Sequence, residues 1–121
     1  MKKYSLLAPL IGLLAASLAF VGFQSSSAEL TSAKLYMQKS EWNKAEAELE
    51  KAVKSDSLDE ESWYYLGIVR GEQKNYPGLM DAFAQALKIS PVHKKDIGQI
   101  IEQARRTTDF LLGLKDKYSE L

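Results

Sequence analysis

The chain has 121 residues, and its 16 Lys and Arg balance its 16 Asp and Glu, so the formal net charge is zero. This length suits one domain, and the charge balance argues against a nucleic-acid binder, which usually has a basic surplus. The chain has no cysteine and one histidine. These counts exclude a disulfide framework, a thiol nucleophile, a zinc–cysteine site, a His-rich metal site and a lipid-anchored lipoprotein.

The segment 1–28 differs in composition from the rest of the chain. Lys2 and Lys3 precede an uncharged, largely apolar run, Leu6–Phe23. This order is typical of a secretory signal, and Ser26 and Ala28 fit the small-x-small cleavage pattern. An uncleaved membrane anchor is the alternative, because a helix over Leu6–Phe23 is just long enough to cross a bilayer core.

Both alternatives predict the same topology. The basic residues precede the apolar run, so the N-terminus stays inside and the body, residues 29–121, is exported. The expected location is the periplasm, or the inner membrane of a bacterium with the C-terminal domain outside the cytoplasm. Membrane contact would then occur through residues 6–23 if the segment stays uncleaved.

The body contains an internal repeat with a period of about 34 residues, a length that is typical of stacked helix pairs. Residues 40–53 align with residues 74–87, which pairs Trp42 with Tyr76, Leu49 with Phe83 and Ala52 with Ala86. The aligned positions combine large apolar or aromatic residues with small ones, as the packing of helix pairs requires.

Helical periodicity divides the body into six predicted helices. The first two cover 29–39 and 43–55. The third opens at a capping box, Ser57-x-x-Glu60, and the fourth has Pro77 in its first turn. The fifth contains Ile97, Ile100, Ile101 and Ala104, and the sixth is capped by Asp109.

The second repeat resembles a tetratricopeptide repeat. Trp63, Leu66 and Gly67 match the opening W-x2-L-G of that family, and Phe83 and Pro91 match later positions. The resemblance covers repeat one, about 26–58, less fully than repeat two, about 59–92. Residues 93–121 form a degenerate repeat or capping helices.

Repeat two departs from the family pattern at two positions. Arg70 stands where an aromatic residue is usual, and Leu79 where a small residue is usual. Repeat one keeps Tyr36 and Ala45 at these positions but lacks the Trp and Leu-Gly opening.

The resemblance implies an all-α fold: about two and a half to three helix pairs stacked as a short right-handed α-solenoid, preceded by the signal or anchor segment. Its core signature here is Tyr36, Trp42, Ala45, Leu49, Ala52, Trp63, Leu66, Gly67, Tyr76, Phe83, Ala86 and Pro91.

The first helix of each pair lines the concave face in this family, which implies where a partner would bind. The candidates are Lys34, Met37, Tyr64, Tyr65, Ile68, Glu72, Lys95, Glu102 and Arg105. Tyr64, Tyr65 and Ile68 are the informative ones. They form either an exposed aromatic interface or part of a helix that its neighbours bury on all sides.

No catalytic constellation is visible, and the sequence predicts no enzyme, cofactor or metal site. His93 lies at a helix start with no nucleophile beside it, and we expect it to be exposed to solvent. The acidic run Asp59-Glu60-Glu61 suits a helix N-terminus, and Arg105-Arg106 suits a helix C-terminus.

The predicted function is a non-catalytic adaptor or scaffold at the bacterial cell envelope. It would bind a protein or peptide on its concave face and no nucleic acid. The alternative is a self-assembling structural protein that uses Phe110–Leu121 as the contact, because the apolar cluster of that tail is more than one helix face can bury.

Overall fold

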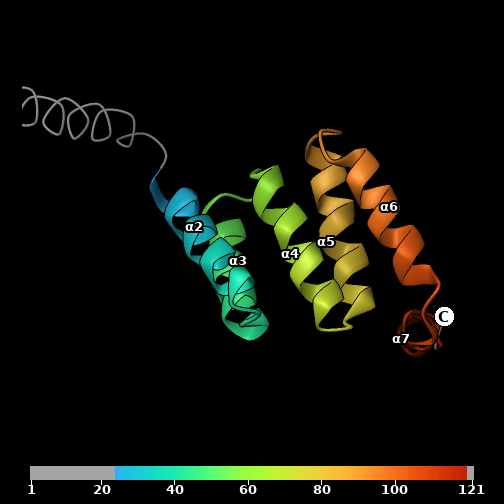
Figure 1. The fold of residues 1–121 in the computed structure, drawn as a ribbon. Helices are drawn as coiled ribbons and strands as arrows, with labels where there is room; N and C mark the ends of the chain where they lie inside the picture. The colour runs from blue at the N-terminus through green and yellow to red at the C-terminus, as the bar shows by residue number, and fades with distance from the viewer. Residues whose placement is uncertain (1–23, 120–121) are drawn as a thin grey trace, which may run out of the picture.

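The computed structural model describes residues 24–119, which form helices and no strands (Figure 1). The expected all-α class is therefore confirmed. The helices are α2 (Gln24–Gln38), α3 (Trp42–Ser55), α4 (Glu60–Glu72), α5 (Tyr76–Ile89), α6 (Lys94–Arg105) and α7 (Thr108–Tyr118).

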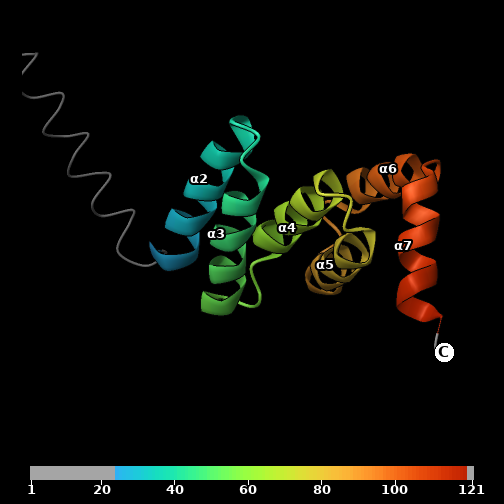
Figure 2. The ribbon, with the colours of Figure 1, turned by 90° about the horizontal axis from the view of Figure 1, so that it is seen from below.

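Helices α2 to α6 are arranged as successive antiparallel neighbours. Helix α2 packs along α3, α4 packs along α5, and α3 joins the two pairs by packing on α4. Figure 2 views this row from below, with α7 at its far end. The molecule is thus repeat-like, with two complete pairs followed by α6 and α7.

The turns inside the two helix pairs have the same backbone conformation. Ser40 and Lys74, which occupy equivalent positions in the two repeats, hold the left-handed conformation with φ of 57° and 61°. The next amide in each turn donates to a carbonyl five residues back: Glu41 to Tyr36 at 2.9 Å, and Asn75 to Arg70 at 2.8 Å. The repeat found in the sequence is therefore also a repeat of backbone geometry.

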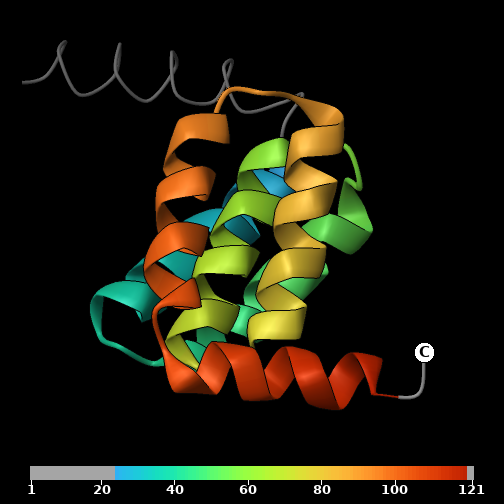
Figure 3. The same ribbon diagram turned by 90° about the vertical axis from the view of Figure 1, so that its right-hand side faces the viewer.

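The turn between α6 and α7, the third equivalent position in the repeat, lacks this geometry. Thr108, at the repeat position equivalent to Lys74, is β-branched and avoids the left-handed region. It begins α7 instead, and Thr107 caps that helix by accepting a hydrogen bond from the Phe110 amide at 3.1 Å. Helix α7 consequently runs crosswise beneath the other helices rather than antiparallel to α6 (Figure 3). Its Phe110 ring packs edge-on against Tyr76 of α5, with centroids 5.4 Å apart.

The core consists of two apolar clusters, one around α2, α3 and α4 and one around α4, α5, α6 and α7. Gly67 brings α4 close to α5, because a Cβ at this position would collide with the Phe83 ring. The signature residues that are buried are Ala45, Leu49, Ala52, Leu66, Gly67, Tyr76, Phe83 and Ala86. Tyr36, Trp42 and Trp63 are only half-buried, and Pro91 is exposed in the turn before α6, so its assignment to the core is wrong.

Three predicted helix starts are wrong. Helix α2 begins at Gln24 rather than at residue 29. The capping box at Ser57 does not form: Asp59 is the N-cap of α4, and its carboxylate accepts from the Ser62 hydroxyl. Thr107, not Asp109, caps α7.

Within the described part of the chain, no helix is long and apolar enough to cross a membrane. The predicted basic start and apolar run, residues 2–23, lie outside the described residues. The predicted cleavage region, 24–28, forms the first turns of α2.

Candidate functional site

The candidate binding site is a hollow between α4, α5 and α6, with a volume of ≈ 320 Å³. It forms because α4 and α5 pack closely along their lengths, whereas the backbone of α6 stays farther from α5. Its floor is mainly apolar and its rim is polar. The floor is formed by Ile68, Gly71, Tyr76, Leu79, Ile100 and Ala104, and the rim by Glu72, Gln103 and Thr107.

The lower end of the hollow is fixed by the turn into α7. The Thr107 hydroxyl donates to the Ala104 carbonyl at 2.7 Å, and the same oxygen accepts from the Phe110 amide. Phe110 itself is buried against Tyr76. The end of α6 is therefore held by α7, which rests on α5 and sets the width of the hollow.

The start of α6 is joined to α4 by a cluster of three side chains, Glu60, Tyr64 and His93. The His93 ring stacks on the Tyr64 ring, with centroids 3.8 Å apart and planes 7° apart. His93 Nδ1 lies 2.8 and 2.9 Å from the two carboxylate oxygens of Glu60. Glu60 is only 9% exposed, so His93 supplies the hydrogen bond that a buried carboxylate requires.

Tyr64 is enclosed by this cluster. Its ring also packs on Phe83, at a centroid distance of 6.1 Å, and on Tyr65, at 5.2 Å. Burial raises the pKa of Tyr64, and the charge of Asp96 adds to the rise. Tyr64 is buried, which is the second of the two alternatives predicted for it, so its side chain is not exposed to a partner. The prediction that His93 is exposed to solvent is wrong, because its side chain is half-buried. Both rings are covered because each covers the other.

A second polar contact joins α2 to α4. Lys34 Nζ lies 2.8 Å from Glu61 Oε1 and 4.9 Å from the centre of the Tyr65 ring. The hydrogen bond to Glu61 is the main cause that raises the pKa of Lys34. The ion pair is partly solvated, so it contributes little to stability. Two of the predicted partner residues, Lys34 and Tyr65, nevertheless contact each other here.

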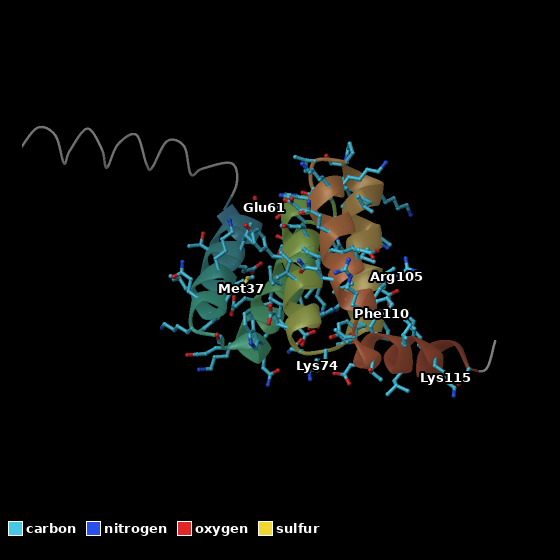
Figure 4. All side chains as sticks on the ribbon, turned by 45° about the vertical axis from the view of Figure 1, so that its right-hand side comes forward. Met37, Glu61, Lys74, Arg105, Phe110 and Lys115 are labelled. Carbon is cyan, nitrogen blue, oxygen red and sulfur yellow. The ribbon has the colours of Figure 1, made fainter. Side chains whose placement is uncertain are left out.

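The remaining candidates spread over three helices (Figure 4). Met37 packs against the first core cluster on α2, and Arg105 is exposed on α6, on the other side of α4 from Met37. Lys95 and Glu102 line a shallow depression on the outer face of α6. The structure therefore brings only Ile68 and Glu72, of the predicted set, into the hollow.

Seven residues that line the hollow were not among the predicted partner-binding residues: Gly71, Tyr76, Leu79, Ile100, Gln103, Ala104 and Thr107. Ile100 and Ala104 were recognised only as an apolar stripe of the fifth predicted helix. Helical periodicity identifies which side of a helix is apolar, but not how closely that side approaches its neighbours.

The hollow has groups that suit the binding of a ligand. It offers an apolar floor, an amide, a hydroxyl and a carboxylate. Among residues 24–119, no group of three His, Cys, Asp or Glu is arranged to hold a metal ion.

Comparisons with protein-family models, with curated proteins and with solved structures found no match to this chain.

Proposed function

We propose that this protein is a non-catalytic, tetratricopeptide-like interaction module whose hollow between α4 and α6 takes an apolar side chain of a protein or peptide partner. The observation that supports this is the composition of the hollow: the floor is mainly apolar, and Glu72, Gln103 and Thr107 stand on its rim. An apolar pocket with a few placed polar groups is the usual form of a recognition site, and buried anchors carry most of the energy of such interfaces.

The repeat period supports the assignment to this class of protein. It recurs in sequence, in helix bounds and in the left-handed residues Ser40 and Lys74. The partner-binding role follows from the same premise, because stacked helix pairs present extended surfaces for ligands.

We place the module outside the cytoplasm of a bacterium, either in the periplasm or anchored to the inner membrane. The support is the sequence of the segment 1–28, with a basic start before an uncharged apolar run. The module would then serve as an adaptor for an envelope protein.

The test is a cross-linked pull-down from native envelopes with the full-length chain and a variant that fills the hollow. Gln103 is exposed on the rim, so Gln103→Trp adds bulk over the hollow without disturbing the core. Ala84→Trp is the matched control, because Ala84 is exposed on α5 and does not border the hollow.

We expect a partner that is recovered with the parent chain and with Ala84→Trp and is lost with Gln103→Trp. Equal recovery with all three folded proteins would exclude the hollow as the binding site. Circular dichroism of each variant verifies that the helices remain.

Self-assembly through α7 is the second candidate. Leu111 and Leu112 are 61% and 53% exposed on this helix, and adjacent apolar side chains of this size are typical of an interface. Sedimentation of the full chain in mild detergent tests it. We expect a dimer or larger species that Leu111→Glu/Leu112→Glu converts to a monomer, and a parent chain that is already monomeric would exclude this candidate.

A further inference from the structure

Two turns present an apolar side chain at the same repeat position and at the same end of the molecule. Leu58 lies in the turn between α3 and α4, and Val92, its equivalent in the next repeat, lies in the turn between α5 and α6. Leu58 is 74% exposed and Val92 is 69% exposed, the largest values among the large apolar side chains of the described residues. Single exposed apolar residues are common, but a repeated pair at turn tips is not explained by chance exposure.

Equivalent hydrogen bonds hold both tips. The Leu58 amide donates to the Asp56 carboxylate at 3.0 Å, and the Val92 amide donates to the Ser90 hydroxyl at 3.3 Å. Asp56 and Ser90 also occupy equivalent repeat positions. The first turn is further fixed by the Trp63 indole, which donates to the Ser57 carbonyl at 2.9 Å. The side chains therefore point outward from structured turns.

The chain enters the domain at this end. In Figures 1 and 3, the start of α2 lies at the same end as the turns that contain Leu58 and Val92, whereas the turns of Ser40 and Lys74 lie at the opposite end. Helix α2 begins at Gln24, directly after the uncharged apolar run Leu6–Phe23. A run of this length is long enough to enter a bilayer, and in the sequence α2 follows it directly.

We propose that this end, the Leu58/Val92 edge, rests on the lipid surface and that both side chains insert into the interfacial layer. The proposal rests on the anchored form of the proposed function. Tethering by residues 6–23 brings the edge to the lipid, so weak insertion of two apolar side chains is sufficient to orient the domain.

The charged residues near the Leu58/Val92 edge do not favour anionic over zwitterionic lipid. Lys88, Lys94 and Lys95 are exposed near Val92, whereas Asp56 and Glu61 lie near Leu58. An edge of mixed sign has no strong preference for anionic headgroups. Insertion is therefore expected to be apolar and to occur in zwitterionic lipid.

The experiment uses the absence of cysteine from the chain. Leu58→Cys, Val92→Cys and Lys39→Cys in the full-length protein are labelled with a polarity-sensitive nitrobenzoxadiazole dye and reconstituted in phosphatidylcholine vesicles. Lys39 is the matched control, because it is exposed in the turn at the opposite end. Ser17→Cys reports whether the apolar run is in the bilayer.

We expect the labels at 58 and 92 to shift to the blue and to be quenched by lipids with a headgroup nitroxide, while the label at 39 does not respond. Adding phosphatidylglycerol should leave the response unchanged.

A response at 17 but not at 58 and 92 would overturn the proposal while leaving the anchor in place. No response at 17 would overturn it by removing the anchor, and neither result affects the pull-down test of the hollow. A response at one tip only, at 39 as well, or only with anionic lipid would also contradict it.

Discussion

The ring of His93 lies flat on the ring of Tyr64, with their centroids 3.8 Å apart. The same His93 bonds the buried carboxylate of Glu60 through Nδ1. One side chain thus connects the start of α6 to the first turns of α4.

We predict that His93→Ala destabilises the protein by about 1–3 kcal/mol, because it removes the ring contact and leaves the Glu60 carboxylate buried without its partner. Urea unfolding measures the loss. Hydrogen exchange should show faster exchange of α6 amides, with α2 and α3 less affected.

The double variant Glu60→Gln/His93→Ala provides the control for this prediction. Since neutral Gln needs less compensation than a buried carboxylate, the double variant should lose less stability than the sum of the two single variants. Strict additivity would show that the two side chains are not coupled.

Tyr64→Phe should change the dependence of stability on pH. Burial raises the pKa of Tyr64 above its ordinary value of about 10. Over a range of alkaline pH, the folded state then retains the Tyr64 hydroxyl proton while the unfolded state loses it. The contribution of Tyr64 to the free energy of unfolding is therefore fully present below about pH 10 and is lost as the pH rises through the raised pKa. Near neutral pH, the stability of Tyr64→Phe should depend on pH as that of the parent does. In alkali the two should differ, because the parent loses stability as Tyr64 titrates and the variant has no such group.

Urea unfolding at a series of alkaline pH values measures this difference, and tyrosinate absorbance of parent and variant assigns the titration to Tyr64. Parallel pH profiles for the two proteins would contradict the assignment.

Ser40→Gly should stabilise the protein by about 0.5–1 kcal/mol, because a residue with a side chain in the left-handed region costs about 1–2 kcal/mol and Ser40 occupies that region. Part of the gain is offset because glycine makes the unfolded chain more flexible. Ala47→Gly, at an exposed position inside α3, should destabilise by about 1 kcal/mol. If the two glycine variants shifted the midpoint of thermal unfolding in the same direction, strain at Ser40 would be excluded as the explanation.

Gly67→Ala and Gly98→Ala should change stability in opposite directions. A Cβ at Gly67 would collide with the Phe83 ring, whereas a Cβ at Gly98 has no neighbour within 4 Å. Overpacking at the first position should cost about 1–3 kcal/mol. The second, exposed on α6, should gain about 0.5–1 kcal/mol from helix propensity. Chemical denaturation of both variants provides the measurement, and similar stability of the two would show that the helices can separate at Gly67.

Much of the local structure follows from the sequence, because it depends on residues close together in the chain. Periodicity predicted the six helices of the described residues, with Pro77 in the first turn of α5 as expected. The internal repeat predicted equivalent helix pairs. The start of α7 could not be placed as well, since Thr107 and Asp109 are both good capping residues and only the backbone shows that Thr107 is used.

The environment of the candidate site depends on residues far apart in the sequence, and only the tertiary structure decided it. The sequence is compatible with Tyr64 as an exposed interface residue or as a buried one. In the structure Tyr64 is buried because the ring of His93, which lies at the start of a later helix, covers it. The hollow likewise depends on distant segments, because α6 stays away from the backbone of α5 while α7, which follows α6, packs on α5 through Phe110 and Tyr76. Sequence patterns therefore determined which helices form and which faces are apolar, while the distances between those faces were set by packing between distant segments.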